Sequence, residues 1–334
     1  MQARCRRALR YAPNAYRSAR LSQPKLNHSI SVLRSKGTIM QTGIRPLGQE
    51  RFWLLVLLAP TFVGLLFGAL GSVLATLGIS VLEWDLITPP IYVGLKNYVG
   101  LTHDTLFQRA LNTTFAFSAM YVPGTILFSL LIALLLNQKI WGLALFRTMY
   151  FLPSVSSAVA VGLIWSWIYG KDTGLLNYII EQLGGRGVNW LGGQTALPAI
   201  TIVNIWGAIG TGMVIFLAGL QSIPRAYYEA AALDGANSFQ QFFNITLPLL
   251  TPSIFFQTII TTVNSFQAFE YVYILTRGTN GASNTPTLVF SIYRNGFQFF
   301  RMGMASAQAV ILALIIFALT LIYFWLEKRL VVYE

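Results

Sequence analysis

Cysteine, histidine and charged residues are all scarce in this sequence of 334 residues. The single cysteine, Cys5, excludes an internal disulfide. The two histidines, His28 and His103, lie far apart, and neither has a cluster of ligand-type residues beside it. Metal sites in proteins gather several such ligands around one ion. We therefore expect neither an internal disulfide nor a metal site.

The sequence motifs of catalysis are missing as well. No G-x-x-x-x-G-K-[ST] phosphate-binding loop occurs, and Gly170-Lys171 lacks both the upstream glycine and the following Ser or Thr. This excludes ATP hydrolysis by that route. No Ser/His/Asp grouping or close pair of carboxylates suggests covalent catalysis. We expect a chain that is not an enzyme and that binds no cofactor directly.

Charged residues make up only 10% of the sequence and hydrophobic residues 55%, whereas a soluble domain carries about 25% charged residues. Six apolar runs have the length that a hydrocarbon core of about 30 Å requires. They lie near 53–80, 112–136, 148–169, 197–219, 252–275 and 305–326. Lipid offers backbone groups no hydrogen-bond partners, so each run should be a helix. The composition predicts an all-α membrane protein with six transmembrane helices.

The net charge of +12 is distributed unevenly along the chain. With the amino terminus inside, the inner segments hold sixteen Lys and Arg residues, eleven of them in residues 1–51, and the outer segments hold seven. By the positive-inside rule, both termini are cytoplasmic. The basic excess is therefore a topology signal and does not indicate nucleic-acid binding.

Residues 1–45 contain no acid and no sustained apolar periodicity. Three interpretations fit them: a disordered cytoplasmic tail, a start codon assigned upstream of Met40, or an organelle transit peptide. We assign the membrane domain to residues 46–334.

A polar segment at 222–251 separates the fourth and fifth apolar runs, and the predicted topology places it in the cytoplasm. Ser222 can cap a helix over 225–233, with Pro224 in its first turn. Gly235 is expected to end that helix with a positive φ. Asn237 or Ser238 can cap a second short helix, which should stop before Pro248. The segment is predicted to be a compact helical hairpin at the membrane surface.

The hairpin resembles the EAA loop of ATP-binding-cassette (ABC) importer permeases. The resemblance rests on EAA at 229–231, DGA at 234–236, Phe242 or Phe243, Ile245, LP at 247–248 and Pro252. In that family this loop is the coupling helix, which inserts into a groove of a cytoplasmic ATPase. The resemblance implies an ATPase-coupling role for Glu229, Ala230, Ala231, Leu233, Asp234 and Gly235. Small alanines and Gly235 would allow close approach, and Glu229 could pair with a cation. The alternative is an ordinary capped hairpin.

Two further blocks, VGLKNY at 93–98 and FRTMYFLP at 146–153, resemble the sugar-permease branch of that family. The chain departs from the branch at Gly71 or its neighbours, where relatives often have proline, and at 277–281. The resemblance implies the type I importer fold and alternating access in a bacterial inner membrane. It also implies a second permease, two ATP-binding subunits that use the ATP, and an external solute-binding protein. The sequence does not identify the sugar.

Polar residues recur at helical spacing in the fourth and fifth apolar runs. Asn204, Gly207 and Thr211 share one face, and Gln257, Thr261, Asn264, Gln267 and Tyr271 form another stripe. Such groups face a water-filled path or join helices by hydrogen bonds, and the sequence leaves both open. We take Asn204, Thr211, Asn264, Gln267 and Tyr271 as candidates for a substrate path.

Glu270 is the only carboxylate within a predicted span. We expect it to reach interfacial water or to pair with Arg277 or Arg294. An ion-coupled secondary transporter is the alternative function, and Glu270 would be its one candidate coupling group. A membrane enzyme is disfavoured by the missing catalytic groups.

Overall fold

The computed structural model describes residues 47–138, 141–276 and 285–330. The predicted tail lies outside these residues, as do Lys139 and Arg277. Contacts divide the chain into two units, with the boundary between Phe62 and Val63. Within the described residues, the first unit holds most of α1 (Leu47–Val63), and the other elements belong to the second unit.

Four of the described helices are each long and apolar enough to cross a membrane. The first, Phe52–Ser80, runs through α1, the π-helical η2 (Gly64–Leu70) and α2 (Gly71–Ser80). The others are α4 (Thr105–Leu136), α8 (Ala196–Ser222) and α16 (Met302–Leu330). These helices confirm the first, second, fourth and sixth predicted spans. Many of their large apolar side chains are exposed, as expected of helices that face lipid.

The third predicted span, 148–169, is not one continuous helix. The chain forms α5 (Leu143–Val155) and α6 (Ala158–Ile168), whose axes meet at 96°. The break follows Pro153: the Ser156 amide donates to the Pro153 carbonyl, and the Ser156 hydroxyl donates to the Leu152 carbonyl, 2.8 Å away. These local bonds satisfy backbone groups that a continuous helix would pair.

The fifth predicted span, 252–275, is also interrupted. α12 (Thr251–Phe266) ends in a turn, and α13 (Glu270–Thr276) begins after it. At the break the Ala268 carbonyl accepts a hydrogen bond of 3.0 Å from Thr287, far along the chain. α12 follows the 238–249 helix at a bend of 62°. Six spans are reached when each of the two bent pairs, α5 with α6 and 238–249 with α12, counts as one.

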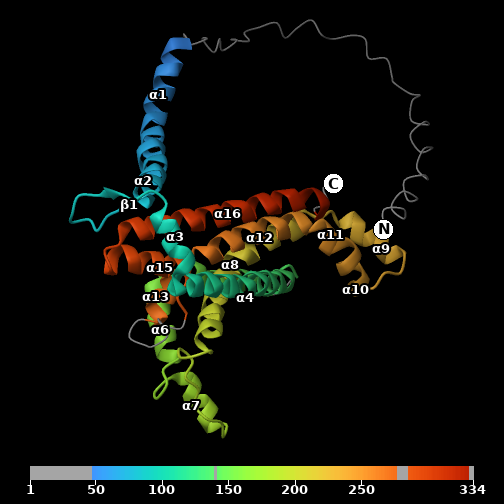
Figure 1. Cartoon of the computed structure of the whole chain (residues 1–334). Coiled ribbons are helices and arrows are strands. Elements are labelled where there is room, and N and C mark those ends of the chain that lie inside the picture. The colour runs from blue at the N-terminus through green and yellow to red at the C-terminus, as the bar shows by residue number, and fades with distance from the viewer. Residues whose placement is uncertain (1–46, 139–140, 277–284, 331–334) are drawn as a thin grey trace, which may run out of the picture. The chain divides into compact units, whose positions relative to one another are not determined.

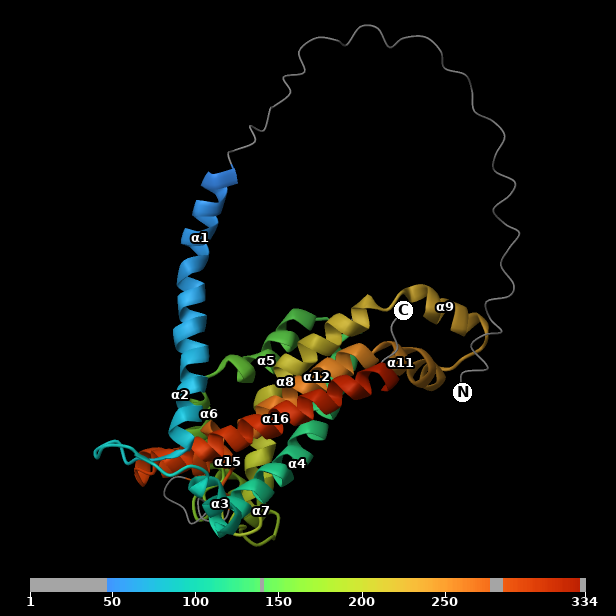
Figure 2. The ribbon, with the colours of Figure 1, turned by 45° about the horizontal axis from the view of Figure 1, so that its top comes forward.

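α4, α8, α12 and α16 lie alongside one another in both Figure 1 and Figure 2. Their interfaces bury Phe117, Phe216 and Phe266, each at most 2% exposed. Buried hydroxyls join the helices: Ser265 donates to Ser118 over 2.7 Å, and Thr262 lies 3.0 Å from the Tyr323 hydroxyl. The second unit is therefore held by apolar packing with a few interhelical hydrogen bonds, as is usual in membrane bundles.

The two ends of this bundle carry different elements (Figures 1 and 2). One end bears the hairpin made of α9 (Arg225–Leu233), α10 (Ser238–Gln241), the π-helical η3 (Phe242–Thr246) and α11 (Leu247–Leu249). The opposite end bears α3 (Lys96–His103), α7 (Leu175–Gln182), α13, α15 (Leu288–Tyr293) and the π-helical η4 (Arg294–Gln298). The bundle thus separates the hairpin from the loops that the charge distribution assigns to the outside.

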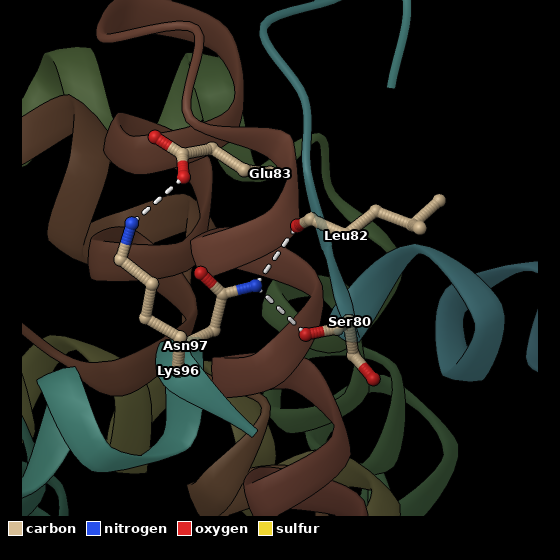
Figure 3. A network of polar contacts seen from close by, with 5 residues as sticks. All are labelled: Ser80, Leu82, Glu83, Lys96 and Asn97. Atoms are coloured by element: carbon tan, nitrogen blue, oxygen red, sulfur yellow. Dashed lines mark hydrogen bonds and ion pairs between the residues drawn. The ribbon is translucent and has the colours of Figure 1, made fainter. Parts of the chain in front are cut away.

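A side-chain clasp connects the end of α2 to α3 (Figure 3). The buried Asn97 amide donates to the carbonyls of Ser80 and Leu82, over 2.8 and 2.9 Å. Lys96 and Glu83 form an exposed ion pair of 3.0 Å. The chain between α2 and α3 forms two short antiparallel strands, β1 (Leu82–Glu83) and β2 (Ile91–Tyr92), with Leu82 opposite Tyr92. The clasp gives the VGLKNY block a structural role.

The loop between the strands and the start of α16 complete this region. The Asp85 carboxylate accepts hydrogen bonds from the Thr88 amide, the Thr88 hydroxyl and the Ile87 amide. These bonds, in that order of size, hold the pKa of the carboxyl below its usual value. The Met302 amide donates to the Trp84 carbonyl over 2.9 Å. Gly303 lies so close to the Leu82 carbonyl that a Cβ there would collide with it.

Candidate functional site

The hairpin helix α9 begins at Arg225 and ends at Leu233, which confirms the predicted bounds. Its start differs from the prediction. Ser222 is still the last residue of α8, and its hydroxyl donates to the Gly219 carbonyl over 2.8 Å. Pro224 occupies the N-cap position with extended backbone angles. The prediction that Ser222 caps α9 was therefore wrong, because α8 extends further than the apolar run.

The turn after α9 is a Schellman motif. Gly235 has a φ of +78°, and its amide donates to the Ala232 carbonyl while the Ala236 amide donates to the Ala231 carbonyl. This confirms the predicted positive φ. A Cβ on Gly235 would meet no atom within 4 Å, so within this chain the glycine is needed for its backbone angle and not for close packing.

The second helix starts as predicted and ends differently. Asn237 and Gln240 form a reciprocal capping box with two hydrogen bonds of 2.9 Å. The helix does not stop before Pro248 but widens into η3, where the Leu247 amide reaches the Phe242 carbonyl. Pro248 then lies in the first turn of α11. The wider turn accommodates a residue without an amide hydrogen, which explains why the predicted end was wrong.

Two side-chain bonds fix the hairpin internally. The Tyr228 hydroxyl lies 3.0 Å from the Thr246 hydroxyl, across the turn. The Gln241 amide donates to the Ala236 carbonyl over 3.1 Å. The first bond ties α9 to the end of η3, and the second ties the Schellman turn to the helix that follows it. The hairpin is therefore held as one body, able to transmit a force applied to its surface.

Of the six predicted coupling residues, Glu229, Ala230, Leu233, Asp234 and Gly235 are exposed and Ala231 is half-buried. Leu233 is 90% exposed and Phe239, across the turn, is 72% exposed. Glu229 and Asp234 form no ion pair with the described part of the chain. The hairpin thus presents apolar side chains flanked by two carboxylates, a surface that suits the groove of another protein.

A second candidate site is a cavity of about 520 Å³ among α4, the α5–α6 break, α8, α12 and α13. Asn204, Asn264, Gln267 and Tyr271 of the predicted path line it together with Gly207 and Glu270. Thr211 does not line it; it is exposed elsewhere, because seven residues carry it about 10 Å along α8 from Asn204. The stripe residues Gln257 and Thr261 are buried among helices instead.

The polar groups of this cavity are largely free to bind a solute. Asn264 and Gln267 are exposed to it, and their side chains make no hydrogen bond within the described chain. Asn204 donates to the Ile200 carbonyl over 2.9 Å and keeps its oxygen as an acceptor. The Tyr271 hydroxyl lies beside Gly207, where a Cβ would approach it to 3.2 Å. Amides, a phenol and a carboxylate thus surround one space.

Both helix breaks open onto the cavity and supply residues that the sequence analysis missed. Ser154 and Ser156 line it from the α5–α6 break, and Phe269 from the break before α13. Phe117 and Tyr121 on α4 also line it, with their rings stacked 5.3 Å apart at 13°. A proline inside an apolar run kinks or breaks a helix, and 153–157 (PSVSS) carried that signal.

Glu270 forms no ion pair within the described residues, in which Lys96–Glu83 is the one salt bridge. Arg294 instead lies over the rings of Phe290 and Phe299, at 5.9 and 5.1 Å. The expected pairing of Glu270 with Arg294 was therefore wrong, and Arg277 lies outside the described residues. Glu270 is exposed and lines the cavity, and its expected contact with interfacial water stays a prediction. No cluster of three or more His, Cys, Asp and Glu residues occurs within the described chain.

Comparison with known proteins gives consistent matches. Residues 104–332 match the family described as "Binding-protein-dependent transport system inner membrane component". The chain is 38% identical over 283 residues to the probable ABC transporter permease protein YesP of Bacillus subtilis, covering 83% of this chain and 91% of that protein. It is 32% identical over 248 residues to the sn-glycerol-3-phosphate permease UgpA of Yersinia enterocolitica, covering 73% and 82%.

Two other matches extend the comparison. The probable starch degradation products permease AmyD of Thermoanaerobacterium thermosulfurigenes is 31% identical over 282 residues, covering 83% of this chain and 94% of that protein. Among solved structures, a chain of a bacterial ABC transporter that imports the acidic polysaccharide alginate superposes with a TM-score of 0.75 at 26% identity. That match covers 84% of this chain and 97% of the other.

Proposed function

Because the chain belongs to the binding-protein-dependent transport system inner membrane component family, we propose that it moves a sugar across a bacterial inner membrane by alternating access, driven by separate ATPase subunits. The chain is an ABC transporter permease, a multi-pass membrane protein whose own role is transport. The names of AmyD and UgpA state sugar-derived or polyol phosphate cargo for those relatives. This kinship supports the sugar assignment.

The observation that carries the proposal is the pairing of two sites on one bundle. The exposed, cross-braced hairpin occupies one end, and the polar cavity lies among the helices that continue from it. α8 leads into α9, and α11 leads into α12, so both helical arms of the hairpin continue into helices that line the cavity. A displacement of the hairpin therefore moves Asn204 through one helix and Asn264 through the other.

The coupling follows from this connection. The ATPase contacts the six coupling residues of the hairpin, which are Glu229, Ala230, Ala231, Leu233, Asp234 and Gly235. ATP binding favours the conformation in which the cavity opens outward. ATP shifts the permease only by its differential affinity for the two conformations. A second permease supplies the opposite wall of the cavity, and an external solute-binding protein delivers the sugar. In this arrangement the hairpin and both termini are cytoplasmic. The larger number of Lys and Arg residues in the segments on that side supports this orientation.

Reconstituted uptake tests this function. Proteoliposomes that contain the permease pair, the two ATPase subunits and enclosed ATP should take up sugar from the external binding protein. Omission of the ATPase or of ATP should abolish uptake, and an ionophore that collapses ion gradients should leave it unchanged. Uptake that needs no ATPase and follows an ion gradient would favour a secondary transporter instead.

A further inference from the structure

The charge of the cavity narrows the class of sugar that this permease can accept. Kinship alone leaves the charge open, because UgpA is named for a phosphate ester and AmyD for products of starch. The alginate transporter of similar fold imports an acidic polysaccharide. The residues of this chain that face the cavity discriminate between these cases.

Glu270 is the one charged side chain among the described residues that line the cavity. It is exposed to that space and has no cationic partner within the described chain. The described lysines and arginines lie elsewhere: Arg109, Arg294 and Arg301 line a separate pocket of about 340 Å³, and Arg147 reaches the Leu136 carbonyl. Within the described residues, the cavity wall thus carries a negative charge without a compensating cation.

The other lining groups suit neutral hydroxyls. Asn264 and Gln267 offer both donors and acceptors, and the half-buried ring of Tyr271 adds an aromatic group to the cavity wall. The Glu270 carboxylate accepts hydrogen bonds from hydroxyl or ammonium groups. A carboxylate or phosphate on the solute would instead meet a like charge at short range, which disfavours its binding even in a hydrated cavity.

Building on the proposed function, we propose that this permease selects neutral or cationic sugars, and that Glu270 rejects uronates and sugar phosphates from the cavity. Glu270 is a selectivity residue in this account: it binds hydroxyls of the accepted sugar and repels anions. The relation to UgpA and to the alginate transporter then extends to the fold and the transport cycle, and not to the charge of the cargo.

Charged thiol reagents test the charge of the cavity without knowledge of the cargo. In the complete transporter with Cys5→Ser, a cysteine at Asn264→Cys reports access from the cavity. The rates of modification by a cationic and an anionic methanethiosulfonate of similar size are compared at low salt. We expect Glu270→Gln to lower the cation-to-anion rate ratio roughly tenfold, the order expected for the loss of a unit charge from the cavity that holds the cysteine. Glu181→Gln, which neutralises an exposed carboxylate outside the cavity, is the control and should leave the ratio unchanged.

An unchanged ratio in Glu270→Gln would overturn the assignment of the cavity charge. Uptake by the reconstituted transporter tests the cargo: uptake of a neutral or amino sugar supports the proposal, and uptake of a uronate or sugar phosphate by the unmodified protein overturns it. If no sugar is taken up with ATP, the proposed function fails, whereas the reagent ratio still decides the charge of the cavity. The two failures are therefore distinguishable.

Discussion

The Tyr228 hydroxyl on α9 lies 3.0 Å from the Thr246 hydroxyl at the end of η3, eighteen residues along the chain. Thr246 is buried and Tyr228 half-buried, so this bond lies inside the hairpin and not on its docking surface. It closes the hairpin across the turn at Gly235. The bond therefore couples the movement of α9 to that of η3, which leads through α11 into α12.

Tyr228→Phe removes this bond and retains the ring. We expect a loss of about 1 kcal/mol in hairpin stability, the usual net value of such a hydrogen bond. Coupling should suffer: ATPase activity in the complete transporter should respond less to the loaded binding protein, with unchanged assembly. Tyr227→Phe, on the adjacent exposed tyrosine, is the matched control. Equal coupling in both variants would show that the bond does not transmit movement.

Gly235→Asp should abolish ATPase-coupled uptake while the protein still reaches the membrane. The substitution places a side chain at a φ of +78° and adds a negative charge beside Asp234 on the exposed turn. Uptake by vesicles and the amount of permease in the membrane are the measurements. Gly235→Asn isolates the effect of the charge, because asparagine and aspartate both visit this backbone region. Normal uptake by Gly235→Asp would count against the coupling role of the turn.

Asn264→Ala and Gln267→Ala should each raise the KM for sugar uptake several-fold. Each removes an unpaired amide that faces the cavity, and a hydrogen bond between neutral groups is worth roughly 1 kcal/mol. Thr211→Ala is the comparison, because Thr211 does not line the cavity. Unchanged kinetics in both amide variants would assign these residues to helix packing, the alternative that the sequence leaves open.

Asn97→Ala should destabilise the protein by about 2 kcal/mol, because the carbonyls of Ser80 and Leu82 lose a buried donor. Thermal unfolding of the purified permease measures the effect. Lys96→Ala breaks the neighbouring ion pair, whose partners are exposed, and should cost less than about 1 kcal/mol. A smaller shift in Tm for Asn97→Ala than for Lys96→Ala would contradict this account of the clasp.

The sequence predicted those features that local chemistry determines. The bounds of α9, the positive φ of Gly235 and the cap at Asn237 all follow from residues within a few positions of one another. Four spans follow from long apolar runs. Kinship with ABC permeases was predicted from the hairpin, whose short motif lies within one continuous segment.

The breaks in the third and fifth spans could not be located by hydropathy, because each segment reads as one apolar run despite Pro153 in the third and the polar stripe in the fifth. Their positions depend on contacts between distant segments. Gly210 on α8 lets the α5 backbone approach so closely that a Cβ would lie 2.6 Å from the Tyr150 carbonyl. Thr287 bonds the Ala268 carbonyl from a segment nineteen residues later. Such pairings decide which polar residues near the breaks face the cavity, whereas Thr211 was misplaced because helical spacing gives a shared face and not a shared depth along α8.

Cross-linking tests the central claim, that the hairpin docks on an ATPase, most directly. Benzophenone maleimide is attached to Leu233→Cys in the Cys5→Ser background, since Leu233 is 90% exposed at the hairpin tip. Leu183→Cys, at a side chain 83% exposed beyond α7 at the opposite end of the bundle, is the control. Illumination of the complete transporter should join position 233, and not position 183, to an ATPase subunit. The account would be contradicted if position 233 is labelled, the transporter is assembled and hydrolyses ATP, and no adduct with the ATPase forms.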